Sequence, residues 1–279
     1  MSLKTLAPSY YSRLVTVMRY VGSGERVLNI GCGDGHYNIF LAKRFKEVYG
    51  IDVNPTDITI ARKMYHQKNI TCSVASATCI PFPDNHFDRI VCIEVLEHVK
   101  DHKQAIKEIA RVLKPGGVGI ISVPCANYPF TYDPINWICE RLFARYFPIG
   151  LWGFGHHRLY TMNKLERLFS QVGLITIKKK YLLHFICGIV ENYYLINLLQ
   201  PLTKSDPKNL DTPYRKESPK RRPMKIAFSE PPFLLRKIRD IVMRLDEIIC
   251  GNSKKSPGIF LMVKKSASQK KNIKKPRNL

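Results

Sequence analysis

The sequence predicts an open α/β fold with a mostly parallel sheet and helices on both faces. Apolar runs of strand length alternate with helical patterns over residues 25–125. The first run, residues 27–30, breaks abruptly into a glycine-rich turn, and a helical pattern follows over residues 37–45. A second run, residues 47–53, carries Asp52 near its end. A buried strand that enters a glycine turn and then a helix is how open α/β sheets build nucleotide sites.

The turn itself, Gly31-Cys32-Gly33-Asp34-Gly35, indicates the kind of ligand. Glycines let the backbone turn tightly and let a ligand approach without meeting a Cβ atom, and the following helix offers free N–H groups. The spacing differs from the dinucleotide fingerprint G-x-G-x-x-G, because the sixth position is His36. No Gly-Lys-Ser/Thr follows, which excludes a P-loop. A carboxylate at Asp52 can accept hydrogen bonds from both hydroxyls of a ribose.

This succession of strand, G-x-G-x-G turn and acidic strand end resembles the class I S-adenosylmethionine-dependent methyltransferases, in particular their type 11-like family. The run LKPGG at residues 113–117, followed by an apolar strand, is a further match. The resemblance implies a Rossmann-like sheet of seven strands, mostly parallel with an antiparallel last strand. It also implies a methyltransferase that uses S-adenosylmethionine. The cofactor-binding residues that it implies are Gly31, Cys32, Gly33, Gly35, Asp52, Val53, Ser76, Ala77, Thr78 and Glu94.

Two positions depart from the family pattern. Ser76 stands where an acidic residue commonly accepts the adenine amino proton, so the backbone of Ala77 and Thr78 is left to contact adenine. Asn29 stands where the first strand usually has an acidic residue, which removes one indirect hydrogen bond to the methionine end. We expect these changes to lower cofactor affinity, or a water molecule to replace the missing group.

The remaining core elements follow from caps and periodicity. Asn54-Pro55 and Asp101 are helix-start signals. The helix predicted ahead of the first strand either caps the cofactor pocket or covers the sheet edge. The predicted helices cover residues 9–20, 56–68, 102–113 and 162–171, and the further strands cover residues 70–75, 89–93, 118–123 and 174–180.

Residues 124–157 form an insertion that is rich in aromatic side chains. Residues 135–147 can form an amphipathic helix. Segments after the fifth strand commonly cover the substrate in such folds, and the alternative is that the aromatic residues only pack a small subdomain. At its end, the motif H-x-R-x-Y-T recurs in this methyltransferase group and ties His156, Arg158 and Tyr160 to the substrate rim.

The C-terminal third divides by composition. Residues 181–200 are apolar but carry polar interruptions, so we reject a transmembrane segment there. Residues 233–249 form an amphipathic helix with an apolar stripe, and residues 258–264 form the last strand. The predicted organisation is a core over residues 1–200 with its insertion at 124–157, a basic linker and amphipathic helix at 201–257, the last strand at 258–266, and a disordered basic tail at 267–279.

Charge and cysteine content bear on location. The net charge is +23, and residues 201–279 hold 21 Lys and Arg against 7 Asp and Glu. This basicity indicates a partner surface rather than the chemistry. The eight cysteines are scattered without a C-x-x-C pair, which is typical of reduced cytosolic residues, and the N-terminus lacks a secretory pattern. We therefore expect a cytoplasmic protein, peripheral on the inner membrane face; the oligomeric state stays open.

The candidate catalytic residues are His98, His156 and Tyr160, with His157 beside them. His98 leads, because it follows the fourth strand close to the expected methyl group and an acceptor hydroxyl must lose its proton. A second interpretation assigns Glu94, Glu97 and His98 to a divalent cation, since E-x-x-E-H is similar to the motif of small-RNA and quinone-type O-methyltransferases. The same motif is widespread among relatives without a metal.

Three functions remain open at this point. The first is O-methylation of a small-molecule or lipid-linked acceptor at an anionic membrane surface. The second is RNA methylation, with the basic C-terminal region on phosphates; no RNA-binding module accompanies that region. The third is a non-catalytic scaffold that binds the cofactor. The complete set of the glycine turn, Asp52 and LKPGG favours an enzyme.

Overall fold

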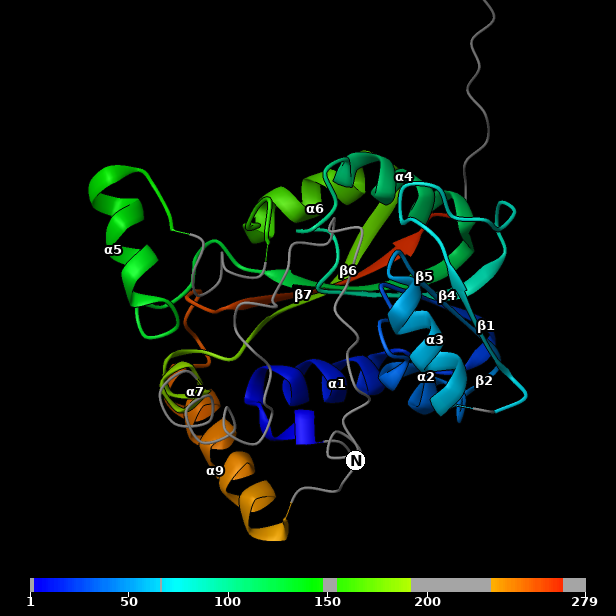
Figure 1. Ribbon diagram of the computed structural model, residues 1–279. Helices are drawn as coiled ribbons and strands as arrows, with labels where there is room; N and C mark the ends of the chain where they lie inside the picture. The colour runs from blue at the N-terminus through cyan, green and yellow to red at the C-terminus, as the bar shows by residue number, and fades with distance from the viewer. Residues whose placement is uncertain (1–2, 66, 148–154, 192–231, 268–279) are drawn as a thin grey trace, which may run out of the picture.

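The centre of the protein is one seven-stranded sheet in the order β3-β2-β1-β4-β5-β7-β6 (Figure 1). The computed structural model describes residues 3–65, 67–147, 155–191 and 232–267. The strands are β1 (Gly24–Ile30), β2 (Phe45–Asp52), β3 (Ile70–Val74), β4 (Phe87–Ile93), β5 (Leu113–Pro124), β6 (Leu174–Leu182) and β7 (Gly258–Lys265). The predicted seven-stranded fold is confirmed.

Strand direction decides where a ligand can sit. β1 pairs in parallel with β2 on one side and with β4 on the other, and β4 pairs in parallel with β5. β7 is antiparallel to both of its neighbours, β5 and β6, as predicted for the last strand. The carboxyl ends of the parallel strands therefore meet at one edge. The chain order reverses between β1 and β4, and the crevice at such a reversal is where open α/β sheets bind ligands.

The helices cover the two faces of the sheet, with α4 and α6 on one face and α1, α2 and α3 on the other (Figure 1). Successive side chains of β1 point alternately toward these two helix layers. Leu28 packs in one core cluster with residues of α4 and α6, and Val27 packs in the opposite cluster with Val17 of α1. The helices are α1 (Pro8–Tyr20), α2 (His36–Leu41), α3 (Pro55–Met64), α4 (His102–Val112), α5 (Pro134–Phe143), α6 (Met162–Ser170), α7 (Phe185–Ile189) and α9 (Phe233–Cys250).

Capping residues start the helices where the sequence predicts. The side chain of Asn54 accepts a hydrogen bond from the N–H of Thr56 at 3.0 Å, and Asp101 accepts one from Gln104 at 3.0 Å. The predicted helix over residues 37–45 is too long, since α2 ends at Leu41. Its expected last residue, Phe45, is buried and begins β2 opposite Gly24.

The long connection between β6 and β7 contains α7 and α9. Residues 192–231 and 268–279 lie outside the described residues, and with them nearly all of the predicted basic linker and tail. The amphipathic helix predicted at 233–249 is present as α9. Among the described residues, no helix is both long and apolar enough to cross a membrane.

Candidate functional site

The glycines of the turn after β1 have different structural roles. Gly31 has φ +68°, and a Cβ there would meet the side chain of Val95 at 2.2 Å, so Gly31 is required by packing. Gly33 has φ +51°, and a Cβ there would meet no atom of the described residues within 4 Å. The space beside Gly33 is thus left open by the described residues. Gly35 supplies the left-handed N-cap of α2.

Asp52 lies at the end of β2 and reaches the same turn. Its carboxylate accepts a hydrogen bond from the N–H of Gly33 at 2.9 Å and another from the N–H of Asn54 at 2.9 Å. Each carboxylate oxygen keeps a further lone pair, which suits the hydroxyls of a ribose. The next residue, Val53, is exposed beside it. The predicted cofactor residues at the ends of β1 and β2 are therefore brought together, whereas the thiol side chain of Cys32 is buried toward α3.

The predicted adenine loop starts at the adjacent strand end. The N–H of Ala75 donates to the backbone oxygen of Asp52 at 3.0 Å, which ties the loop to β2. Within the loop, the hydroxyl of Ser76 contacts that of Thr78 at 2.8 Å and accepts from its N–H at 3.2 Å. Ala77 packs into the core. Ser76 thus stabilises the turn itself, and the loop has the predicted place.

Asn29, the second departure from the family pattern, points away from this edge. It is buried in β1 and donates from its side-chain amide to Asn38 of α2 at 2.8 Å. The pair fixes the helix that follows the glycine turn against the first strand. This position therefore contributes to the site through the placement of α2.

Helix α1 contacts residues at the carboxyl ends of β1 and β4. The hydroxyl of Tyr10 contacts Nδ1 of His36 at the start of α2. Arg13 forms an ion pair with Glu94 at 3.1 Å, and Glu94 also accepts a hydrogen bond from Ser122 at 3.0 Å. These residues of α1 are absent from the sequence prediction. In the sequence, Arg13 is one of two arginines in an amphipathic helical pattern, and nothing marks it out from Arg19.

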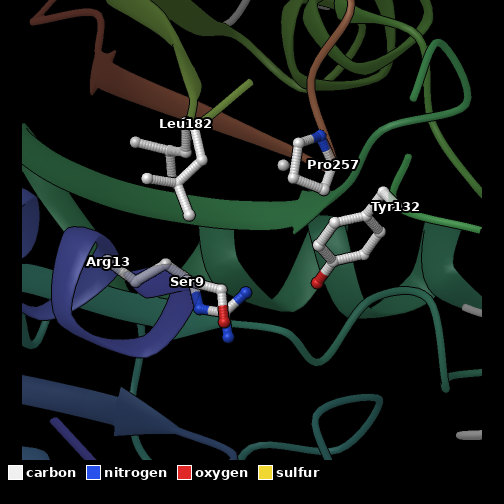
Figure 2. Close-up of a pocket in the computed structure, with 7 residues that line it drawn as sticks. Ser9, Arg13, Tyr132, Leu182 and Pro257 are labelled. Atoms are coloured by element: carbon white, nitrogen blue, oxygen red, sulfur yellow. The ribbon is translucent and has the colours of Figure 1, made fainter. Parts of the chain in front are cut away.

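A small cavity lies next to Arg13, where β6 ends and β7 begins (Figure 2). Arg13 and Ser9 of α1 form one wall, and Tyr132, from the segment before α5, lies across from them (Figure 2). The remaining walls come from the end of β6 and from Pro257 just before β7. The cavity thus joins α1 to the segments that carry α5 and α9.

A second polar cluster follows Glu94 along the chain. Glu97, His98 and His156 present ligand atoms that all lie within 4.8 Å of one another. Nε2 of His98 is 3.7 Å from a Glu97 carboxylate oxygen. Glu97 is fully buried, and neither of its carboxylate oxygens has a hydrogen-bond partner among the residues that the structure describes. The structure thus brings His156 into this group in place of Glu94, whose carboxylate is held by Arg13 and Ser122.

Burial sets the charge state of this cluster. It raises the pKa of Glu97 well above its ordinary value, and the nearby Glu94 carboxylate acts in the same direction. Burial also lowers the pKa of His98, and it lowers the pKa of His156 to about 4. Both imidazoles are therefore neutral at pH 7. A neutral imidazole can accept a proton, and the side chain of His98 retains 29% exposure to solvent.

Tyr160 is held in the core of the protein. Tyr160 is fully buried, and its hydroxyl contacts the backbone oxygen of Leu96 at 3.1 Å and Nδ1 of His102 at 2.7 Å. Arg158 binds the backbone oxygens of Leu96, Val99 and Lys100. The H-x-R-x-Y-T motif thus braces the segment that carries Glu97 and His98. The substrate contacts of Arg158 and the catalytic role of Tyr160 stay predictions.

Comparison with known proteins agrees with this geometry. A family described as a methyltransferase domain matches residues 28–121. A ubiquinone biosynthesis O-methyltransferase of Alkalilimnicola ehrlichii is 35% identical over 102 residues, which are 36% of this chain and 41% of that protein. A demethylmenaquinone methyltransferase of Staphylococcus aureus is 29% identical over 186 residues, 58% of this chain and 73% of that protein. The chain spans less than half the length of the first of these.

The fold has solved counterparts. A phosphoethanolamine N-methyltransferase 2 of Haemonchus contortus, in complex with phosphomonomethylethanolamine and S-adenosylhomocysteine, superposes with a TM-score of 0.59. It is 16% identical, and the match covers 92% of this chain and 53% of that one. At such low identity the likeness concerns the fold alone.

Proposed function

From the class I S-adenosylmethionine-dependent methyltransferase domain that this chain carries, we propose that the protein transfers a methyl group to an oxygen of a small apolar or lipid-linked acceptor. S-adenosylmethionine supplies a sulfonium methyl group for in-line displacement. The enzyme contributes proximity and alignment, which account for about 7–11 kcal/mol of the barrier in the best-oriented reactions. The protein therefore has to bind S-adenosylmethionine and the acceptor, and to remove one proton from the acceptor hydroxyl.

The observation that carries this proposal is the open space beside Gly33, at the point where the strand order reverses. Asp52 borders it with a carboxylate already oriented by the N–H groups of Gly33 and Asn54. The loop at residues 76–78 starts from the neighbouring strand end. A nucleoside fits this combination, with its ribose on Asp52 and its base beside the loop. The methionine end then extends along the turn toward Glu94.

The acceptor end combines an ion pair with a neutral base. Arg13 holds the Glu94 carboxylate at the end of β4, and His98 follows four residues later. In the proposed reaction the acceptor oxygen forms a bond to the methyl carbon as the bond from that carbon to sulfur breaks. The hydroxyl proton passes to the neutral imidazole of His98. The products are the methyl ether and S-adenosylhomocysteine, and His98 returns its proton to solvent.

The proposed acceptor class rests on two supports. The names of two relatives refer to quinones, which combine an apolar body with ring oxygens. Exposed apolar side chains also gather on α5 and α9 of this chain. A lipid-linked acceptor places the enzyme at the inner face of a membrane, as the charge pattern predicts. The test is a screen for transfer of tritiated methyl from S-adenosylmethionine to polyprenyl hydroquinones, soluble catechols and total RNA.

The outcomes of this screen separate the functions. Label in the hydroquinone or catechol fraction supports the proposal. Label in RNA that is sensitive to ribonuclease favours the RNA methyltransferase instead. If S-adenosylmethionine binds and no fraction is labelled, the non-catalytic scaffold is favoured.

We predict that His98→Ala lowers kcat by about 10²- to 10⁴-fold, because proton transfer by a positioned base contributes that much. Cofactor affinity should stay within about twofold. Burial lowers the pKa of His98. In the profile of wild-type kcat against pH, the midpoint of the acidic limb should therefore lie below the ordinary pKa of histidine. Activity is then lost only as the pH drops through that lowered pKa. The measurement is kcat against pH with the acceptor found in the screen.

His86→Ala is the matched control, since His86 lies just before β4 at the opposite end of that strand. It should leave kcat unchanged. Full activity of His98→Ala would remove His98 from the catalytic residues. Loss of wild-type activity on treatment with EDTA, restored by a divalent cation, would instead assign Glu97, His98 and His156 to a metal.

A further inference from the structure

Helix α9 packs with its polar side toward the protein. Arg239, only 4% exposed, donates to the backbone oxygen of Thr5 at 2.6 Å, and its guanidinium carbon lies 3.3 Å from the ring centroid of Tyr11. Asp246, 2% exposed, accepts hydrogen bonds from the N–H groups of His184 at 2.6 Å and Ile186 at 2.8 Å. These buried polar contacts fix the rotation of α9 about its own axis.

This rotation turns the apolar stripe of α9 away from the protein. Leu234 is 68% exposed and Ile248 is 80% exposed. The exposed apolar residues recur at intervals of three and four along the helix and therefore share one face. They are Leu234, Ile238, Ile241, Leu245, Ile248 and Ile249. An amphipathic helix that packs on its own protein normally buries its apolar face. The exposed apolar face of α9 therefore indicates contact with another apolar phase.

Basic side chains border the exposed face. Lys237 and Arg244 are exposed, and their helical positions place them beside the apolar stripe. Glu247, on the far side of the helix, is paired with Lys180 at 3.2 Å. An apolar face flanked by cations is the pattern of a helix that lies in a lipid interface, with the charged groups at headgroup level.

A second helix repeats this arrangement at the same end of the molecule. Figure 1 shows α5 and α9 projecting from the end that also holds α7. On α5 the exposed apolar side chains include Ile135, Ile138 and Leu142. Arg141 is exposed next to them, and its guanidinium carbon lies 3.7 Å from the ring centroid of Trp137.

We propose that the exposed apolar faces of α5 and α9 form a docking surface for an anionic lipid bilayer. The net charge of +23 matches a negative lipid surface, whereas two copies of so basic a chain repel each other. The exposed apolar side chains make no favourable contact with the phosphates of a nucleic acid. Tyr132 before α5 and Pro257 after α9 both line the cavity of Figure 2, so docking brings this end of the site to the bilayer. The inference rests on the proposed function in one respect only, which is that the lipid-linked acceptor lies in the bilayer on which the protein docks.

The test is vesicle flotation with the full-length protein and no S-adenosylmethionine. The vesicles are phosphatidylcholine alone and phosphatidylcholine mixed with phosphatidylglycerol. We expect strong binding to the anionic vesicles and weak binding to the neutral ones. The double substitution Ile241→Gln with Ile248→Gln should weaken binding at least about tenfold, because each exposed isoleucine loses its transfer into the lipid phase. Ile175→Gln with Ile177→Gln on β6 is the matched control and should bind like wild type.

Several results would overturn this inference. Absence of binding to both vesicles, or equal binding by the α9 double variant, contradicts it directly. A wild-type dimer in light scattering that becomes monomeric in the double variant would assign the face to a second copy. A fall of several degrees in melting temperature in the double variant would mean that this chain covers the face itself. Because no cofactor is present, failure here leaves the methyl-transfer proposal standing.

Discussion

Substitution of Gly33 by valine is expected to abolish binding of S-adenosylmethionine while the protein remains folded. The Cβ added at Gly33 meets no atom within 4 Å in the part of the chain that the structure describes, so the valine side chain enters the space assigned to the cofactor. The positive φ of +51° adds backbone strain of about 1–2 kcal/mol. Calorimetric titration should detect no binding, and thermal melting should show a cooperative transition at a somewhat lower temperature.

Gly116→Val provides the matched control. Gly116 also has a positive φ, +77°, and a Cβ there also meets none of the described residues within 4 Å. It lies near the start of β5, at the opposite edge of the sheet. This variant should carry a similar strain and bind the cofactor normally. Gly31→Val should unfold the protein, because its Cβ would overlap Val95. Normal affinity in folded Gly33→Val would show that the cofactor does not lie beside this turn.

The second large effect concerns Asp52. Asp52→Ala should weaken S-adenosylmethionine binding about 100-fold, because two hydrogen bonds from ribose hydroxyls to a charged acceptor are lost at about 1.5 kcal/mol each. The carboxylate also accepts from the N–H of Gly33, so part of the loss comes from a looser turn. Asp52→Asn keeps an acceptor oxygen and should fall between alanine and wild type.

Asp88→Ala controls for the structural part of this effect. Asp88 accepts hydrogen bonds from the N–H groups of Glu25 at 3.1 Å and Arg26 at 2.8 Å, at the other end of β1. Its loss should lower the melting temperature and leave cofactor affinity unchanged. An unchanged dissociation constant in Asp52→Ala would contradict the ribose role.

The sequence was enough to predict which of the residues assigned to the cofactor lie close together. Parallel strands end at one edge, so once the strand pattern is read, the turn at Gly31, the carboxylate of Asp52 and the loop at Ser76 must lie together. Local signals set the helix starts at Asn54 and Asp101, because a cap depends only on its near neighbours. The assignment of these residues to the cofactor stays a prediction.

The acceptor half depends on contacts between distant parts of the chain. The orientation of α9 follows from Arg239 binding Thr5, 234 positions away, and no periodicity reports which side of a helix is anchored. Tyr160 carries a reactive type of side chain in a family motif, yet its hydroxyl is held in the core by Leu96 and His102. The grouping of Glu97 with His156 likewise arises from packing across about 60 residues of chain.

The most direct test of the central claim is calorimetric titration of the purified protein with S-adenosylmethionine and with S-adenosylhomocysteine, using NAD as the control ligand. We predict saturable binding of the first two, one molecule per chain, and no binding of NAD, because the glycine spacing at residues 31–35 is not that of a dinucleotide site. Binding of NAD alone, or of none of the three ligands, would contradict the assignment of this turn to S-adenosylmethionine.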